Sequence, residues 1–220
     1  MKGTKKAVVL MLCVGAVAVS SIFGTMAYFT SQDAVENTFT VGDIEIKLDE
    51  TQVDEYGNPV TPATRTETGN NYKIVPAQTY TKDPTVTVVA DSEPCYVRVL
   101  VSVGITGQNF EEKIDPIFDK YNLKVDDMFT LNTGWTAVNS YLDNSGENRV
   151  YEIRYDTVVD ARTAEQTLPP VFPTFTVPGQ LNNTEVKTLE NLHINVVAQA
   201  IQSAGFDDAD EAWAAFNSQN

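Results

Sequence analysis

The sequence predicts an antiparallel all-β sandwich with short helices in its connections and at its C-terminus. Several segments alternate apolar and polar residues with a period of two, as half-buried strands do, and turns rich in Gly, Pro and Asn separate them. The chain of 220 residues is 42% hydrophobic, which is typical of a folded chain and not of a disordered one. This length fits a single domain with an appendage.

The N-terminal segment differs in composition from the rest of the chain. An apolar run, Ala7–Val19, follows three lysines: Lys2, Lys5 and Lys6. Thr25 and Ala27 place small side chains at the two positions that signal peptidase reads, so we expect cleavage between Ala27 and Tyr28 and a signal peptide over 1–27. The alternative is an uncleaved membrane anchor, but the apolar run is shorter than the roughly 20 residues that span a bilayer.

The mature chain is predicted to be secreted and strongly acidic. We divide it into an N-terminal arm, 28–38, and one sandwich domain, 39–220. Removal of three lysines lowers the Lys and Arg count from 15 to 12 against 30 Asp and Glu, a formal charge of −18. Cys95 is then the only cysteine, so an intrachain disulfide is excluded, as suits a bacterium that does not depend on oxidative folding.

The strand predictions rest on alternation. The clearest strand runs from Cys95 to Ile105, where every odd-numbered residue is apolar. The same period occurs in four further segments: 44–48, 85–89, 151–155 and 192–200. Two longer stretches, 50–84 and 165–183, are rich in Thr, Pro and polar residues and are predicted to be loops.

Helices are predicted only where capping residues occur. Three pairs mark helix starts: Asn109 with Glu112, Asp115 with Pro116, and Asp208 with Glu211. In the last of these helices, Trp213 and Phe216 lie three residues apart, so both can pack against the sheets.

The residues give little support for catalysis, and the chain is predicted not to be an enzyme. His193 is the single histidine, and no H-E-x-x-H motif or G-x-S-x-G elbow occurs. Cys95 is expected to be a buried apolar side chain and His193 a surface residue on the polar face of a strand. We therefore assign no catalytic, cofactor-binding or metal-binding residue. A net charge of −15 argues against nucleic acid as a partner.

Acidic clusters leave weak calcium binding open. The densest, Asp207–Glu211, does not follow the spacing of a calcium-binding loop. Its position at a predicted helix start is better explained by the favourable interaction of carboxylates with the positive end of the helix dipole.

The start of the mature chain resembles a known family. Residues 26–31 read M-A-Y-F-T-S and residues 37–46 read N-T-F-T-V-G-D-I-E-I. A small-residue cleavage site, an aromatic pair, a polar stretch and N-x-F-x-x-G before the first strand are similar to the SipW-type signal peptides and early sequence of the TasA/camelysin (CalY) family. The match covers about residues 3–48.

This resemblance implies a jelly-roll sandwich that is exported by a signal peptidase of SipW type and assembles into biofilm-matrix fibres of a Gram-positive bacterium. It implies that the N-terminal arm of one copy adds as a strand to the next copy, in a head-to-tail homopolymer. The apolar contacts of that donor strand would come from Tyr28, Phe29 and Val35. A minor anchoring subunit as a further partner is left open.

Three alternatives remain. The arm can fold back into its own sheet or fray. The chain can be a monomeric cell-surface adhesin or ligand-binding sandwich, with the loops 50–84 and 165–183 as its binding face. It can also be a camelysin-like surface metallopeptidase, a class for which the sequence shows no metal-ligand pattern.

Overall fold

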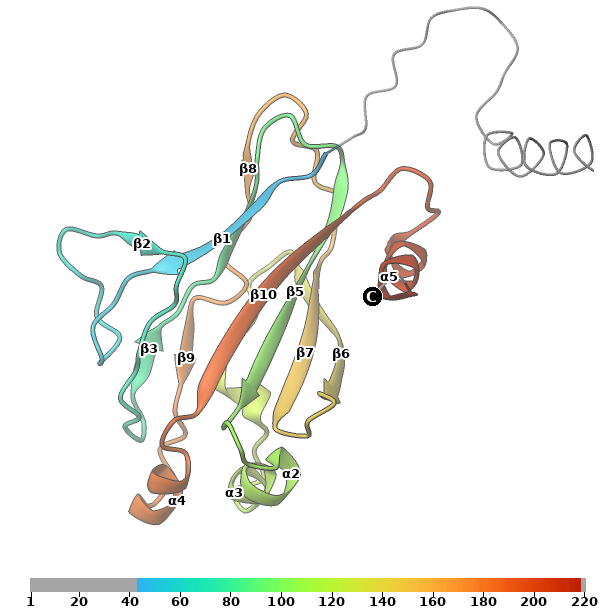
Figure 1. Cartoon of the computed structure of the whole chain (residues 1–220). Coiled ribbons are helices and arrows are strands. Elements are labelled where there is room, and N and C mark those ends of the chain that lie inside the picture. The colour runs from blue at the N-terminus through green and yellow to red at the C-terminus, as the bar shows by residue number, and fades with distance from the viewer. Residues whose placement is uncertain (1–42, 219–220) are drawn as a thin grey trace, which may run out of the picture. The chain divides into compact units, whose positions relative to one another are not determined.

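Antiparallel sheets dominate the computed structural model, which describes residues 43–218 (Figure 1). Every strand pairing in it is antiparallel, and the helices between the strands are short. The prediction of an all-β chain with short helices is therefore confirmed. The described residues belong to one unit, which spans 42–220.

One sheet has the strand order β2-β1-β4-β8. Its central pair, β1 and β4, matches the two alternating segments expected at 44–48 and 85–89. Leu48 lies opposite Val86, so the apolar side chains of both strands share a face. The bounds of the four strands are Arg65–Thr66 (β2), Ile46–Thr51 (β1), Thr85–Val88 (β4) and Gln166–Thr167 (β8).

A second sheet has the order β10-β5-β7-β6. Its central strand β5 presents the predicted apolar row to the core, and all of its valines are fully buried. The strand β6, which the alternation does not predict, forms one edge, and β10 forms the other. The bounds are His193–Gln202 (β10), Cys95–Gly104 (β5), Asn148–Tyr155 (β7) and Trp135–Leu142 (β6).

The two stretches predicted to be loops contain strands, and two of these strands pair with each other. β3 (Thr79–Thr81) from the first stretch and β9 (Thr174–Thr176) from the second form a two-stranded sheet. Tyr80 and Phe175 lie opposite each other in it, and their rings stack with centroids 4.8 Å apart. The prediction of loops was wrong here because β3 and β9 have only three residues each, which is too short for an alternation of apolar and polar residues to be visible.

The main hydrophobic core contains residues of all three sheets. Val86, Val101 and Ile153 are among its fully buried members, together with Tyr80 of β3. Burial of this kind supplies about 25 cal/mol per Å² of apolar surface and is the main force that holds the sheets together.

Three helices and one 3₁₀ turn occupy the connections, and a fourth helix follows the last strand. As predicted, the Asn109 side chain accepts a hydrogen bond from the Glu112 N–H, and Pro116 lies in the first turn of the next helix. The unpredicted helix α4 starts with a capping box in which the Asn182 side chain accepts from the Glu185 N–H. The bounds are Phe110–Lys113 (α2), Asp115–Asp119 (α3), Val125–Met128 (η1), Asn183–Thr188 (α4) and Ala209–Ser218 (α5).

The C-terminal helix α5 packs beside the sheet that contains β10 and β5 (Figure 1). The side chain of Asp208 accepts a hydrogen bond from the Glu211 N–H at 2.9 Å, which confirms the predicted cap. Trp213 is buried, and its ring forms an edge contact with Phe216. Both aromatic residues therefore face inward as the sequence predicts.

Candidate functional site

The strand β10 leaves a backbone edge unpaired within residues 43–218. It pairs along its full ten residues with β5, from His193 opposite Gly104 to Gln202 opposite Cys95. No other described strand pairs with its second edge. An edge of this length presents a row of free N–H and C=O groups, and such a row can accept a further strand.

The apolar face of β10 is incompletely covered. Ile194, Val196, Ala198 and Ala200 pack against the main core, yet no residue of β10 is fully buried. By contrast, the neighbouring strand β5 has a continuous row of valines without any exposure. The apolar side chains at the edge of the sheet where β10 lies are therefore only partly covered by the rest of the described chain.

A groove borders the first half of β10, residues 193–197, at this incompletely covered edge. Two cavities of about 960 and 380 Å³ form it, and we call them together the β10 groove. The two cavities adjoin, because five residues line both: Thr68, Gly69, Lys82, Ile194 and Asn195. One wall is β10, and the other consists of segment 66–74 and the end of β1. In Figure 1, β1 and β10 separate toward the end where β3 and β9 lie.

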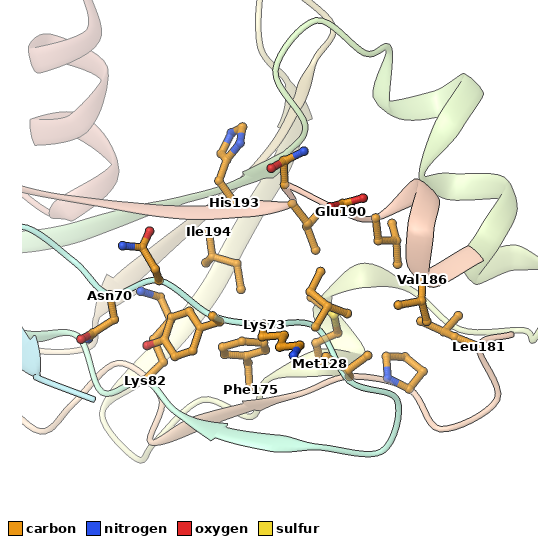
Figure 2. Close-up of a pocket in the computed structure, with 18 of the residues that line it drawn as sticks. Asn70, Lys73, Lys82, Met128, Phe175, Leu181, Val186, Glu190, His193 and Ile194 are labelled. Carbon is orange, nitrogen blue, oxygen red and sulfur yellow. The ribbon is translucent and has the colours of Figure 1, made fainter. Parts of the chain in front are cut away.

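The floor of the wider cavity is apolar. In Figure 2, Ile194 points from β10 into the cavity, toward Phe175 on the opposite side. Four further apolar side chains close the end near α4: Met128, Leu181, Val186 and Leu189. A concave apolar surface of this kind can accept large apolar side chains from a ligand or another chain.

The rim of the wider cavity carries more basic than acidic groups, although the whole chain is acidic. Lys73 and Lys187 line it against a single carboxylate, Glu190, whereas the charge of Lys82, which also lines the cavity, is buried and paired with Glu50. His193 also borders the cavity, but its ring points away from it in Figure 2. The His193 Nε2 lies 2.7 Å from the Asn148 side-chain oxygen. The wider cavity therefore favours an acidic occupant.

A buried ion pair lies where the two cavities meet. The Lys82 ammonium donates to Glu50 over 2.7 Å, and the exposed fractions of the two residues are 4% and 5%. The Asn70 side chain donates to the other oxygen of Glu50 over 2.8 Å. Burial, and then the charge of Glu50, raise the pKa of Tyr72 beside them.

Sequence analysis missed these two charged residues, although a signal exists. Glu50 continues the row Ile44, Ile46 and Leu48 with the same period of two, so it falls on the face of β1 that becomes buried. Lys82 continues the face of buried Tyr80 in the same manner. A charged residue in register with an apolar row indicates a paired, buried charge.

The residues predicted to carry function lie outside the described part of the chain. This applies to the cleavage site, Ala27 and Tyr28, and to the donor-strand contacts Tyr28, Phe29 and Val35. Cys95 is fully buried, as expected, and burial raises the pKa of its thiol to about 11.

Neither the described residues nor the comparisons with known proteins identify an activity. Among the residues placed in the structure, no group of three His, Cys, Asp or Glu is arranged to hold a metal ion. Within the same range, no helix has both the length and the apolarity needed to cross a membrane. The chain matches no protein-family model, and no curated protein or solved structure is significantly similar to it. The β10 groove and the sequence are therefore the features from which a function can be inferred.

Proposed function

We propose that this chain is a secreted structural protein that assembles into extracellular biofilm-matrix fibres by donor-strand exchange. The N-terminal arm 28–38 of one copy pairs with the free edge of β10 in the next copy. The observation that carries the proposal is this ten-residue edge, whose first half, 193–197, borders the β10 groove. The resemblance of residues 3–48 to exported matrix proteins supports secretion and the fibre.

A strand from another chain would supply what the β10 edge lacks: backbone pairing partners and a cover for its half-buried apolar side chains. Its backbone pairs with the free N–H and C=O groups, and alternate side chains enter the groove. Phe29 and Val35 are both odd-numbered, so an extended arm presents them on the same face, with Tyr28 on the opposite face. We assign Phe29 and Val35 to the groove.

The charges favour an arm that runs antiparallel to β10. In that direction the C-terminal half of the arm, with Asp33 and Glu36, reaches the end of β10 at His193. The lysines of the wider cavity lie at this end, among them Lys73 and Lys187. Opposite charges then face each other across the contact.

The inserted strand would complete a jelly-roll-like sandwich. It would lie at the edge of the β10-β5-β7-β6 sheet and cover the half-buried side chains of β10. Because the arm and the groove are different surfaces of one chain, the contact does not close on itself and extends as a filament.

Negative-stain microscopy of purified chains tests the proposal from both sides of the contact. Chain 28–220 should form fibres, and a chain that begins at Phe39 should remain monomeric because it lacks the donor. On the acceptor side, Val196→Asp places a charge on the groove face of β10 and should stop fibre growth. Val138→Asp is the matched control, since Val138 is 46% exposed on β6, the opposite edge of the same sheet.

Two outcomes would contradict the assignment. Fibres from the chain that begins at Phe39 would show that the arm is not the donor. Fibres from a folded Val196→Asp variant would show that β10 is not the acceptor. A monomeric chain 28–220 whose arm resists proteolysis would indicate instead that the arm occupies its own groove.

A second candidate function is ligand binding by a monomeric surface protein. The observation in its favour is that the two stretches expected to form a binding face meet in the pair β3 and β9 and line the same cavity of about 960 Å³. Persistent monomers at high concentration, together with saturable binding of a ligand that Phe175→Ala abolishes, would support it.

A further inference from the structure

At the meeting point of the two cavities, the buried Glu50 and Lys82 and the half-buried Asn70 form a cluster of three groups with complementary reactivity. Glu50 on β1 accepts from the Lys82 amine at one carboxylate oxygen and from the Asn70 amide at the other. The amine and the amide are therefore neighbours across one carboxylate. Figure 2 labels Asn70 and Lys82 together at one end of the cavity.

The surroundings of the cluster are aromatic and poorly solvated. The Lys82 ammonium lies 5.9 Å from the centroid of the Tyr72 ring, which forms edge contacts with Tyr80 and Phe175. Separated charges cost free energy in such a place. The hydrogen bond between Lys82 and Glu50 is the path along which a proton can leave the amine, and a lysine amine that has given up this proton is a nucleophile.

Two backbone groups fix the orientation of the Asn70 amide. Its oxygen accepts a hydrogen bond from the Val53 backbone N–H at 2.9 Å, and its nitrogen donates to the Thr51 carbonyl at 2.8 Å. The Val53 N–H would stabilise the negative charge that develops on this oxygen when a nucleophile adds, as an oxyanion hole does.

We propose that Lys82 and Asn70 form an intramolecular amide cross-link that Glu50 promotes. The lone pair of Lys82 Nζ forms a bond to Asn70 Cγ, and the bond from Cγ to Nδ2 breaks. Glu50 gives the leaving nitrogen the proton that it took from the amine and takes one of the two protons left on Nζ, so that the other stays on the new secondary amide. The products are one secondary amide and one molecule of ammonia, so no oxidant or other reactant is required.

The cross-link fixes one wall of the β10 groove. It ties segment 66–74, which lines both cavities, to the chain immediately after β3. The bond does not depend on fibre formation, so its test is separate from that of the proposed function.

Mass spectrometry of a tryptic digest of the purified full chain tests the bond directly. Without a cross-link, trypsin releases the linear peptides 66–73 and 74–82, because Arg65, Lys73 and Lys82 are cleavage sites. A cross-linked Lys82 is not cleaved. The digest then contains a branched species that joins 66–73 to 74–98 and is lighter than the two peptides by one ammonia.

The wild-type chain should give the branched species, with fragmentation that places the link at Asn70. A folded wild-type chain that yields only the two linear peptides, at unchanged mass, would overturn the proposal. This result does not rely on a variant, so it remains informative even if substitutions in the cluster prevent folding.

Variants assign the roles of the three residues. Glu50→Gln keeps the shape of the side chain but cannot move protons, and it should abolish the branched species; Lys82→Arg keeps the tryptic site and should do the same. Asn71→Ala removes the neighbouring amide of the same peptide and should leave the link intact. A branched species that persists in Glu50→Gln would overturn the role of Glu50, and its loss in Asn71→Ala would overturn the assignment to Asn70.

Discussion

The guanidinium carbon of Arg98 lies 4.2 Å from the ring centroid of Trp213, and this contact fastens the C-terminal helix to the sheet. Arg98 is 4% exposed on the outer face of β5, where it also donates to Gln199 at 2.7 Å and to Asn217 at 2.7 Å. Its ion pair with Glu152 adds a third partner. A buried charge is tolerated here because α5 and the sheet together supply its partners.

Replacement of Trp213 by Ala should destabilise the chain by about 3–5 kcal/mol, the usual cost of removing a buried Trp. The substitution also leaves Arg98 without its aromatic cover. Urea unfolding followed by circular dichroism measures the change. Ala214→Gln, on the exposed side of the same helix, is the control and should change stability by less than about 0.5 kcal/mol. Equal effects of the two variants would show that α5 is not held by this contact.

Two glycines with similar positive φ angles allow the cost of backbone strain to be distinguished from the cost of a steric clash. Gly57 and Gly107 have φ angles of +80° and +76°. A Cβ at Gly57 would lie 2.7 Å from the Cα of Tyr80, whereas one at Gly107 would meet nothing within 4 Å. Gly107→Ala should therefore cost only the strain of a positive φ, about 1–2 kcal/mol. Gly57→Ala should cost a further 1–3 kcal/mol or so through the steric clash.

Thermal and urea unfolding of both glycine variants, side by side, provide the measurement. Because Tyr80 is in the core beneath the β10 groove, Gly57→Ala should also weaken any binding to the groove. Equal destabilisation by the two variants would show that the turn at Gly57 can move away from β3.

The stability of the helix α4 should depend on pH through Glu185. A hydrogen bond from Lys120, and then the Asn182 backbone N–H, lower the pKa of Glu185 from 4.5 to about 2. Because the pKa is lower in the folded chain, the stabilisation is complete above pH 4.5 and is lost as the pH falls toward 2. Urea midpoints between pH 2 and 7 should show that Glu185→Gln is destabilising at neutral pH and neutral near pH 2.

The control for this pH dependence is Glu165→Gln, at an exposed position in the connection after β7. It should run parallel to the wild-type chain at every pH. A constant difference between Glu185→Gln and the wild-type chain, down to pH 2, would contradict the role of the Glu185 charge.

The sequence alone was sufficient to predict those strands that bury one face in the core. In β5, the apolar row from Cys95 to Val103 is fully buried because β7 and β10 flank it on both sides. In β6, most side chains are exposed, so selection for alternation is weak and no period of two is visible. The pairing of β3 with β9 joins segments far apart in the chain and has no local signal.

The candidate site was less predictable than the strands. Alternation places Ile194 and Val196 on an apolar face, but it does not tell that β10 lies at an edge. Edge position follows from the order of strands in the sheet, which distant contacts determine. Likewise, the alternation puts Glu50 in register with a buried row, yet its partner Lys82 comes from a segment without recognisable periodicity.

The acid excess of the mature chain should control how fibres associate laterally. Chain 28–220 carries 30 acidic against 12 basic residues, so the proposed fibres should repel each other at neutral pH. The full sequence has a pI of about 4.3, so the repulsion between fibres of the more acidic chain 28–220 should weaken strongly toward that acidic range, and salt screens it over about 10 Å at 0.1 M. Turbidity and negative-stain microscopy at pH 8 and pH 4 should show separate fibres at the higher pH and bundles at the lower. Added salt or divalent cations at pH 8 should produce bundles as well, because both weaken the same repulsion. Identical bundling at the two pH values would mean that lateral contacts are apolar and that the surface charge has another role.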